Sequence, residues 1–204
     1  MEDEVLDRIP PGATTLSCFC QSGASLQPGA EVRWLEQKND APFPPVPFPS
    51  NRLYREAGHA CLAELVVRHH ERLRDSVIGH LFPEDPVAFS ATVARTLNFV
   101  IEASGGPALF TRSEGGMRLR ERHFGVTIDE NVRDRWLLEL LRAFDDVSFP
   151  DQWRPSYWRW MEALSIRMIN RRTRMQPPPR YPYEQAREKL QRVLREGDGN
   201  GDGK

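Results

Sequence analysis

From residue 51 onward, apolar residues recur at steps of three and four, and this periodicity constrains the fold more than any other feature. Such spacing places apolar side chains on one face of a helix, which can then be buried against other helices. The pattern predicts helices over about residues 55–79, 86–103, 117–123, 128–147, 155–172 and 183–196. No segment shows the alternation of a half-buried strand. We therefore predict an all-α fold.

Local signals support several of these helix boundaries. Asp85 followed by Pro86 is typical of a helix start, because the aspartate can accept a free backbone N–H and proline fits the first turn. The run Ser-Gly-Gly-Pro at 104–107 is a strong stop. Thr127 and Glu130 have the spacing of a capping box, which predicts the start of the next helix.

The first 50 residues differ in composition from the rest of the chain. They hold eight of the 17 prolines, and the proline-dense stretch 41–49 cannot sustain a helix or a central strand. We interpret this stretch as an extended linker. Residues 1–50 are therefore expected to form a proline-rich N-terminal extension that is loosely ordered or lies along the domain surface.

Charge and hydropathy exclude several kinds of partner. The chain has 28 basic and 29 acidic residues, a net charge of −1, so it shows no basic footprint for nucleic acid and no charged block for a membrane surface. No apolar run approaches the length of a membrane span, and residues 1–5 are acidic where a secretory signal would be basic. We expect a cytoplasmic protein without nucleic-acid or membrane partners.

The cysteines and the C-terminal tail carry little metal-binding signal. Cys18, Cys20 and Cys61 cannot all pair, and no second closely spaced set completes a zinc site, so free thiols are expected. The tail at 198–204 matches the first seven positions of an EF-hand loop but ends before the bidentate glutamate. We interpret residues 176–204 as a C-terminal helix followed by a flexible acidic tail.

Four short segments carry a resemblance to a known family. They are Phe-Pro-Glu-Asp at 82–85, Gly-Gly-Pro at 105–107, Arg-Leu-Arg-Glu-Arg-His at 118–123 and Arg-Asp-Arg-Trp-Leu at 133–137. In order and spacing they resemble the signature segments of truncated haemoglobins, especially those of the second group. The resemblance implies a globin-like two-over-two helical sandwich around haem b, with residues 51–175 as the truncated globin domain.

The resemblance identifies His123 as the iron ligand. From its residue type alone, a histidine after an arginine-rich stretch would more often be an exposed surface residue. A haem iron, however, needs a neutral imidazole held firmly beside the porphyrin, and His123 matches the proximal histidine of the family. The remaining histidines have no comparable motif, and they are His59, His69, His70 and His80.

On the distal side, the resemblance points to an indole and a pair of histidines. Trp136 stands where the second group places a tryptophan whose N–H points at the bound ligand, although a core role alone would also explain it. His69 stands where the family commonly has a tyrosine. It can donate to a ligand or coordinate the iron itself. If the match to the family is shifted by one residue, His70 takes this role instead. A surface position is the alternative for either histidine.

The other expected site residues surround the porphyrin. Thr92 and Thr96 are assigned to the distal wall, and Arg95 to a haem propionate, with a solvated surface arginine as the equal alternative. Phe82 is expected to pack on the haem, although ordinary core packing would also explain it. Further contacts are assigned to Phe99, Phe110, Leu119, Arg122 and Val126.

These assignments lead to a functional hypothesis and a rival. The hypothesis is reversible binding of O₂, with NO and CO as further ligands, at ferrous haem. No flavin or nicotinamide motif is present, so NO dioxygenase or peroxidase-like turnover would require an external reductase. The rival is a haem-free, globin-like helical module that interacts with partners through its terminal extensions.

Overall fold

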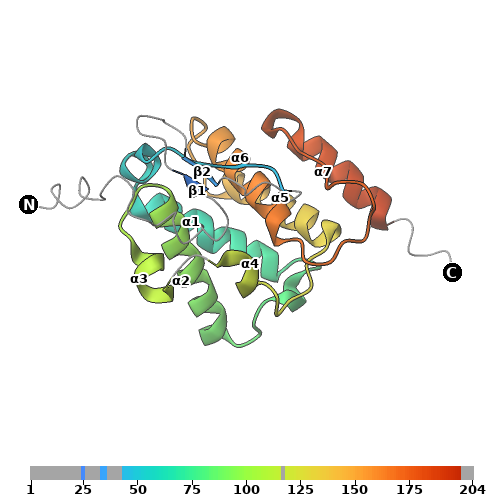
Figure 1. The fold of residues 1–204 in the computed structure, drawn as a ribbon, viewed down its shortest axis with the longest axis horizontal. Coiled ribbons are helices and arrows are strands. Elements are labelled where there is room, and N and C mark those ends of the chain that lie inside the picture. Colours follow the sequence, from blue (N-terminus) through green and yellow to red (C-terminus); the bar gives the residue numbers. More distant parts are fainter. Residues whose placement is uncertain (1–23, 26–32, 36–42, 116–117, 199–204) are drawn as a thin grey trace, which may run out of the picture.

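The computed structural model describes residues 24–25, 33–35, 43–115 and 118–198, and within them the chain is mostly helical (Figure 1). The helices are α1 (Arg52–Arg74), the 3₁₀ turn η2 (Gly79–Leu81), α2 (Pro86–Ala103), α3 (Leu109–Glu114), α4 (Leu119–Arg122), α5 (Glu130–Asp146), α6 (Arg154–Met168) and α7 (Tyr183–Asp198). The predicted all-α fold is confirmed.

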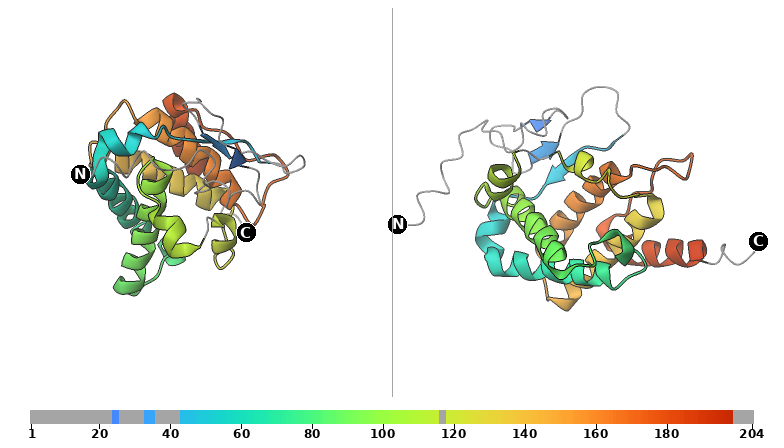
Figure 2. Two further views of the ribbon diagram at one scale, coloured as in Figure 1. Left: turned by 60° about the vertical axis from the view of Figure 1, so that its left-hand side comes forward. Right: turned by 90° about the horizontal axis from the view of Figure 1, so that it is seen from below.

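Two pairs of helices form the body of the molecule. α1 packs against α2, α5 packs against α6, and α1 also contacts α5, so the two pairs lie against each other (Figures 1 and 2). A single core contains buried residues from all four helices. This is the two-over-two arrangement that the resemblance implies.

The start and stop predicted for α2 are confirmed. Asp85 caps the helix by accepting a hydrogen bond from the backbone N–H of Ala88 at 2.8 Å, and Pro86 occupies the first turn. The helix ends before Gly105, which has a φ of +94°. A Cβ at Gly105 would lie 2.3 Å from the carbonyl oxygen of Asn51, so glycine allows the end of α2 to touch the start of α1.

Other predicted boundaries were wrong. The cap of α5 is Asp129, whose carboxylate accepts the N–H of Val132 at 2.9 Å, and not Thr127. α1 ends at Arg74, five residues early, and α6 ends at Met168 where the chain turns away. The six-residue helix α3 was not predicted, because so short a segment shows too little periodicity.

The prediction that no segment forms a strand was also wrong. β1 (Ala24–Ser25), β2 (Arg33–Leu35) and β3 (Val46–Phe48) form a small antiparallel sheet in the order β1-β2-β3, at one edge of the helical body (Figure 2). Pro47 is tolerated because β3 is an edge strand. Val46 and Phe48 are buried, and the Phe48 ring lies 5.7 Å from that of Trp160 in α6. This end of the proline-rich stretch therefore joins the core.

The last described helix, α7, packs against α5 (Figure 1) and buries Ala186, Leu190 and Leu194. Among the described residues, no helix combines the length and apolar character that a bilayer crossing requires. Cys61 is a half-buried free thiol in α1. The predictions for Cys18, Cys20 and the tail at 199–204 concern residues outside the described ranges.

Candidate functional site

A cavity of about 580 Å³ opens between the two helix pairs, and it falls within the range of about 300–1,000 Å³ typical of ligand pockets. Its walls come from α1, α2, α5 and α6, with the short helices α3 and α4 at the side. All thirteen site residues predicted from the sequence line it. They are His69, His70, Phe82, Thr92, Arg95, Thr96, Phe99, Phe110, Leu119, Arg122, His123, Val126 and Trp136.

His123 follows directly after α4 and is half-buried at the cavity wall. Its Nδ1 lies 2.6 Å from the carbonyl oxygen of Leu119. Because a carbonyl only accepts hydrogen bonds, Nδ1 carries the proton and Nε2 keeps its lone pair. No other described residue bonds to the ring. The imidazole is therefore oriented as a metal-binding histidine usually is, with one nitrogen donating to the backbone and the other free.

His69 and His70 lie side by side in α1, and both are buried. Burial lowers the pKa of His69 to about 3 and also lowers the pKa of His70, so both rings are neutral near pH 7. His69 Nε2 donates to the carbonyl of Trp136 at 3.1 Å, and His70 Nδ1 donates to the carbonyl of Val66 at 2.8 Å. Each ring therefore spends its only N–H on the backbone and keeps one bare nitrogen.

Trp136 is half-buried on α5, with its ring centroid 4.7 Å from that of His69 in an edge-to-face arrangement. Among the described residues, nothing accepts a hydrogen bond from its indole N–H. An indole nitrogen can only donate. Of the three distal side chains with ring nitrogens, Trp136 is thus the one with a donor to spare.

A family model described as bacterial-like globin matches residues 53–170, which is more than half of the chain. The chain belongs to the bacterial-like globin family. This membership implies a haem-binding protein, and it confirms the resemblance to truncated haemoglobins. The residues at the cavity fit a haem, because the cavity has a largely apolar wall and histidines, His123 among them, that each keep a ring nitrogen free to bind iron.

Three relatives illustrate this membership. The group 2 truncated hemoglobin YjbI of Bacillus subtilis is 28% identical over 121 residues, 59% of this chain and 89% of the relative. The crystal structure of phosphate-bound Hell's gate globin IV has a TM-score of 0.70 and 43% identity, covering 76% of this globin and 97% of that chain. The structure of a truncated oxygen-avid haemoglobin from Bacillus subtilis has a TM-score of 0.54 and 28% identity, covering 57% of this globin and 98% of that chain.

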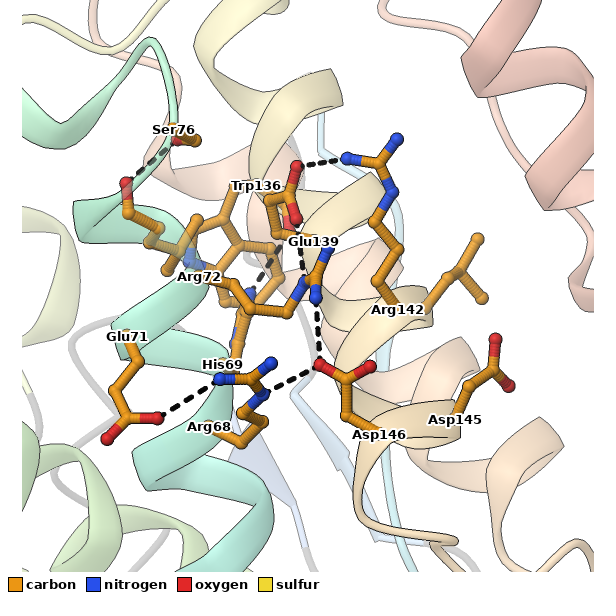
Figure 3. A network of polar contacts seen from close by, with 12 residues as sticks. Arg68, His69, Glu71, Arg72, Ser76, Trp136, Glu139, Arg142, Asp145 and Asp146 are labelled. Atoms are coloured by element: carbon orange, nitrogen blue, oxygen red, sulfur yellow. Dashed lines mark hydrogen bonds and ion pairs between the residues drawn. The ribbon is translucent and has the colours of Figure 1, made fainter.

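A polar network ties together the two helices that carry the distal residues of this globin (Figure 3). Arg72 of α1 reaches across to α5, donating to Glu139 at 2.9 Å and to Asp146 at 2.8 Å. Arg68 adds a bond to Asp146 at 2.7 Å, and Arg142 adds one to Glu139 at 2.7 Å. Since Glu139 is 3% exposed, its pairing with Arg72 is shielded from water. The network fixes His69 relative to Trp136.

The threonines and arginines of the site, which line the cavity, already have protein partners. Thr92 Oγ1 donates to the carbonyl of Ala88, and Thr96 Oγ1 donates to the carbonyl of Thr92. Arg95 is exposed and donates to Thr92 Oγ1 at 3.3 Å. Arg122 pairs with Glu114 at 2.7 Å. Both arginines line the cavity and are exposed.

The phenylalanines of the site line the cavity and pack against other rings. Phe99 and Phe110 are buried, with ring centroids 5.6 Å apart and a T-shaped geometry. The Phe82 ring lies 6.1 Å from that of His70 and 6.4 Å from that of Phe89. These contacts form rigid apolar surfaces against which a flat ligand can pack.

Several lining residues were not identified from the sequence. Most are apolar residues of α1, α5 and α6, such as Leu65, Leu140, Tyr157, Met161, Leu164 and Met168. Their spacing marks them as core, and the pattern carries no signal that separates core from cavity wall. No three His, Cys, Asp or Glu side chains gather as a metal site within the described part of the chain.

Proposed function

We propose that this globin binds haem b in the cavity, with His123 as the iron ligand, and that it binds O₂ reversibly, with NO and CO as further ligands. The observation that carries the proposal is the imidazole of His123, oriented by the Leu119 carbonyl at the wall of a cavity of about 580 Å³. When bound, ferrous haem supplies the metal to which a diatomic gas attaches.

The chain's own residues give this site its properties. His123 holds the iron through Nε2, and the apolar wall excludes water from the ligand. We assign Arg95 and Arg122 to the propionates, and their position at the cavity and their exposure support this assignment. Trp136 supplies the hydrogen-bond donor for the ligand. Contacts to the porphyrin face come from Phe82, Phe99, Phe110, Leu119 and Val126.

A relative supports O₂ as the ligand, and O₂ binding also needs no second protein. The Bacillus subtilis structure is described as that of an oxygen-avid haemoglobin. Turnover as an NO dioxygenase or a peroxidase would draw electrons from an external reductase, since the sequence has no flavin or nicotinamide motif. Oxygen binding requires no such partner.

Haemin titration of the purified full chain tests the proposal. The wild type should bind haemin at a ratio of one to one with an intense Soret band, and its ferrous form should bind and release O₂ reversibly. His123→Ala should lose the histidine-ligated spectrum. His59→Ala, a change on the exposed side of α1, is the matched control and should leave the spectrum unchanged. An unaltered spectrum in His123→Ala would overturn the proposal.

A further inference from the structure

The segment that carries His123 is too short to hold its own position. α4 has only four residues, and an isolated helix of that length is unstable in water. After His123 the chain runs without regular structure to Asp129, the cap of α5. A ligand that must stay within a fraction of an ångström of its metal therefore requires support from another part of the fold.

That support comes from Asn170, two residues beyond the end of α6. Its Nδ2 donates to the carbonyl of His123 at 2.9 Å and to the carbonyl of Val126 at 2.8 Å. Its Oδ1 accepts the backbone N–H of Ile128 at 2.9 Å. The backbone N–H of Asn170 donates in turn to the carbonyl of Ile128 at 3.0 Å. One side chain thus bonds to three residues of the 123–128 turn.

The chemistry of these contacts calls for an amide. The turn presents two carbonyl oxygens and one N–H, so its partner must offer two donors and one acceptor in one plane. Asparagine has that set, whereas aspartate at neutral pH has acceptors alone. Both donors point at groups that only accept, so the orientation of the amide is determined by its partners.

Arg120 supports the other side of the same segment. Its Nη1 donates to the carbonyls of Arg167 and Ile169, at 2.5 Å and 2.9 Å, so α4 is also anchored to the end of α6. The Arg120 guanidinium also lies 5.3 Å from the centre of the Phe43 ring, in a cation–π contact. Together these hydrogen bonds attach the His123 segment to the residues at the end of α6.

We propose that Asn170 is a positioning residue for His123. Asn170 acts through the backbone of His123 and so sets the orientation of the imidazole toward the haem. The inference rests on the proposed function, in which His123 binds the iron. Asn170 holds the carbonyl of His123, and Leu119 holds its Nδ1, so the residue is fixed at both backbone and ring.

The test compares two aspartate substitutions in the full haem-loaded chain. Asn170→Asp keeps the size and the acceptor but replaces the donor with an oxygen that faces two carbonyls. Asn131→Asp makes the same change at an exposed position on α5, where the side chain oxygen accepts from Arg174 and the contact is retained. The readouts are the iron–histidine stretching band in resonance Raman spectra of the ferrous form and the rate of haemin loss to apomyoglobin.

We expect Asn170→Asp to shift or broaden the iron–histidine band and to speed haemin loss by about 10-fold to 100-fold, the usual effect of removing such a support. Asn131→Asp should change neither. Asn170→Ala, which introduces no charge, carries the same test should the aspartate variant fail to fold. If the wild type lacks an iron–histidine band, the proposed function fails. If the wild type has it and both Asn170 variants keep it unchanged, only the role of Asn170 fails.

Discussion

At the scale of single residues, the hydrogen bonds of the distal histidines leave Trp136 as the candidate donor to a ligand of the proposed haem. His69 and His70 are neutral, and each donates its one proton to a backbone carbonyl. Neither has a second N–H to offer a bound gas. Trp136 keeps its donor, so in the proposed function the indole is the side chain that would stabilise a partially negative ligand.

Replacing Trp136 should therefore have a larger effect on oxygen than replacing a histidine. A hydrogen bond to a charged group contributes about 1.5–3 kcal/mol, so Trp136→Phe should raise the O₂ dissociation rate by about 10-fold to 100-fold. His70→Leu removes an acceptor and should change that rate by less than about threefold. Stopped-flow measurement of O₂ release from both variants checks this. A His70→Leu effect as large as that of Trp136→Phe would mean that the imidazole donates.

The residues of the site differ in how visible they are in the sequence. His123 and Trp136 stand in motifs whose order and spacing carry the resemblance, so the sequence alone marks them as candidates, and both line the cavity. It does not identify Asn170, which lies outside those motifs and whose partners are 42 to 47 residues away in the chain. A contact over that distance depends on how two helix ends meet, and no local pattern records it.

At the scale of elements, the segment before α7 is built into the globin body. Tyr181 is buried, and its hydroxyl donates to Asp134 of α5 at 2.9 Å. Its N–H donates to Glu162 of α6 at 3.2 Å, and its carbonyl accepts the indole N–H of Trp158 at 2.6 Å. Arg180 adds an ion pair to Glu162 at 2.8 Å. The C-terminal segment therefore joins α5 and α6 from outside.

Removing the Tyr181 hydroxyl should show how much its hydrogen bond to Asp134 contributes to stability. Tyr181→Phe leaves a buried carboxylate with one partner fewer, and the free energy of unfolding should fall by about 1–3 kcal/mol. Tyr183→Phe, a half-buried tyrosine whose ring lies 6.4 Å from that of Trp158, keeps its packing and should cost less than about 0.5 kcal/mol. Urea unfolding of both variants makes the comparison. Equal losses would show that the bond to Asp134 contributes nothing specific.

At the scale of the whole molecule, a buried charge cluster joins the cavity wall to the C-terminal segment. Arg133 lines the cavity and is 1% exposed, and its guanidinium contacts Glu162 at 2.8 Å, Asp134 at 3.3 Å and the carbonyl of Pro179 at 2.9 Å. Every nitrogen of this arginine has a partner. Buried charges of this kind are tolerated because they are paired, and they make stability depend on pH.

Asp134 should give that dependence an unusual sign. Burial raises its pKa from the usual 3.8 to about 6 against the pull of Arg133, so between about pH 4 and 6 the folded chain holds a proton that the unfolded chain releases. Its contribution to stability therefore falls as the pH rises across that window. The lowered pKa of His69, about 3, acts oppositely, since the unfolded chain takes up a proton there as the pH falls.

Asp134→Asn should remove the first contribution and leave the second. The free energy of unfolding should then rise more steeply between pH 4 and 6, by up to about 1.4 kcal/mol per pH unit relative to the wild type. Urea unfolding at several pH values in that window measures the slope. A variant that is less stable at every pH but has the wild-type slope would show that Asp134 is ionised throughout.

The sequence by itself determined the fold class, the helices of the core and thirteen of the residues that line the cavity. Each of these follows from patterns within short stretches of chain, namely helical periodicity, capping residues and motifs in a set order. Only the tertiary structure decided the edge strand at Val46–Phe48, the early end of α6 and the support of His123 by Asn170. Their energies come from hydrogen bonds and burial between segments far apart in the chain, which local patterns do not encode.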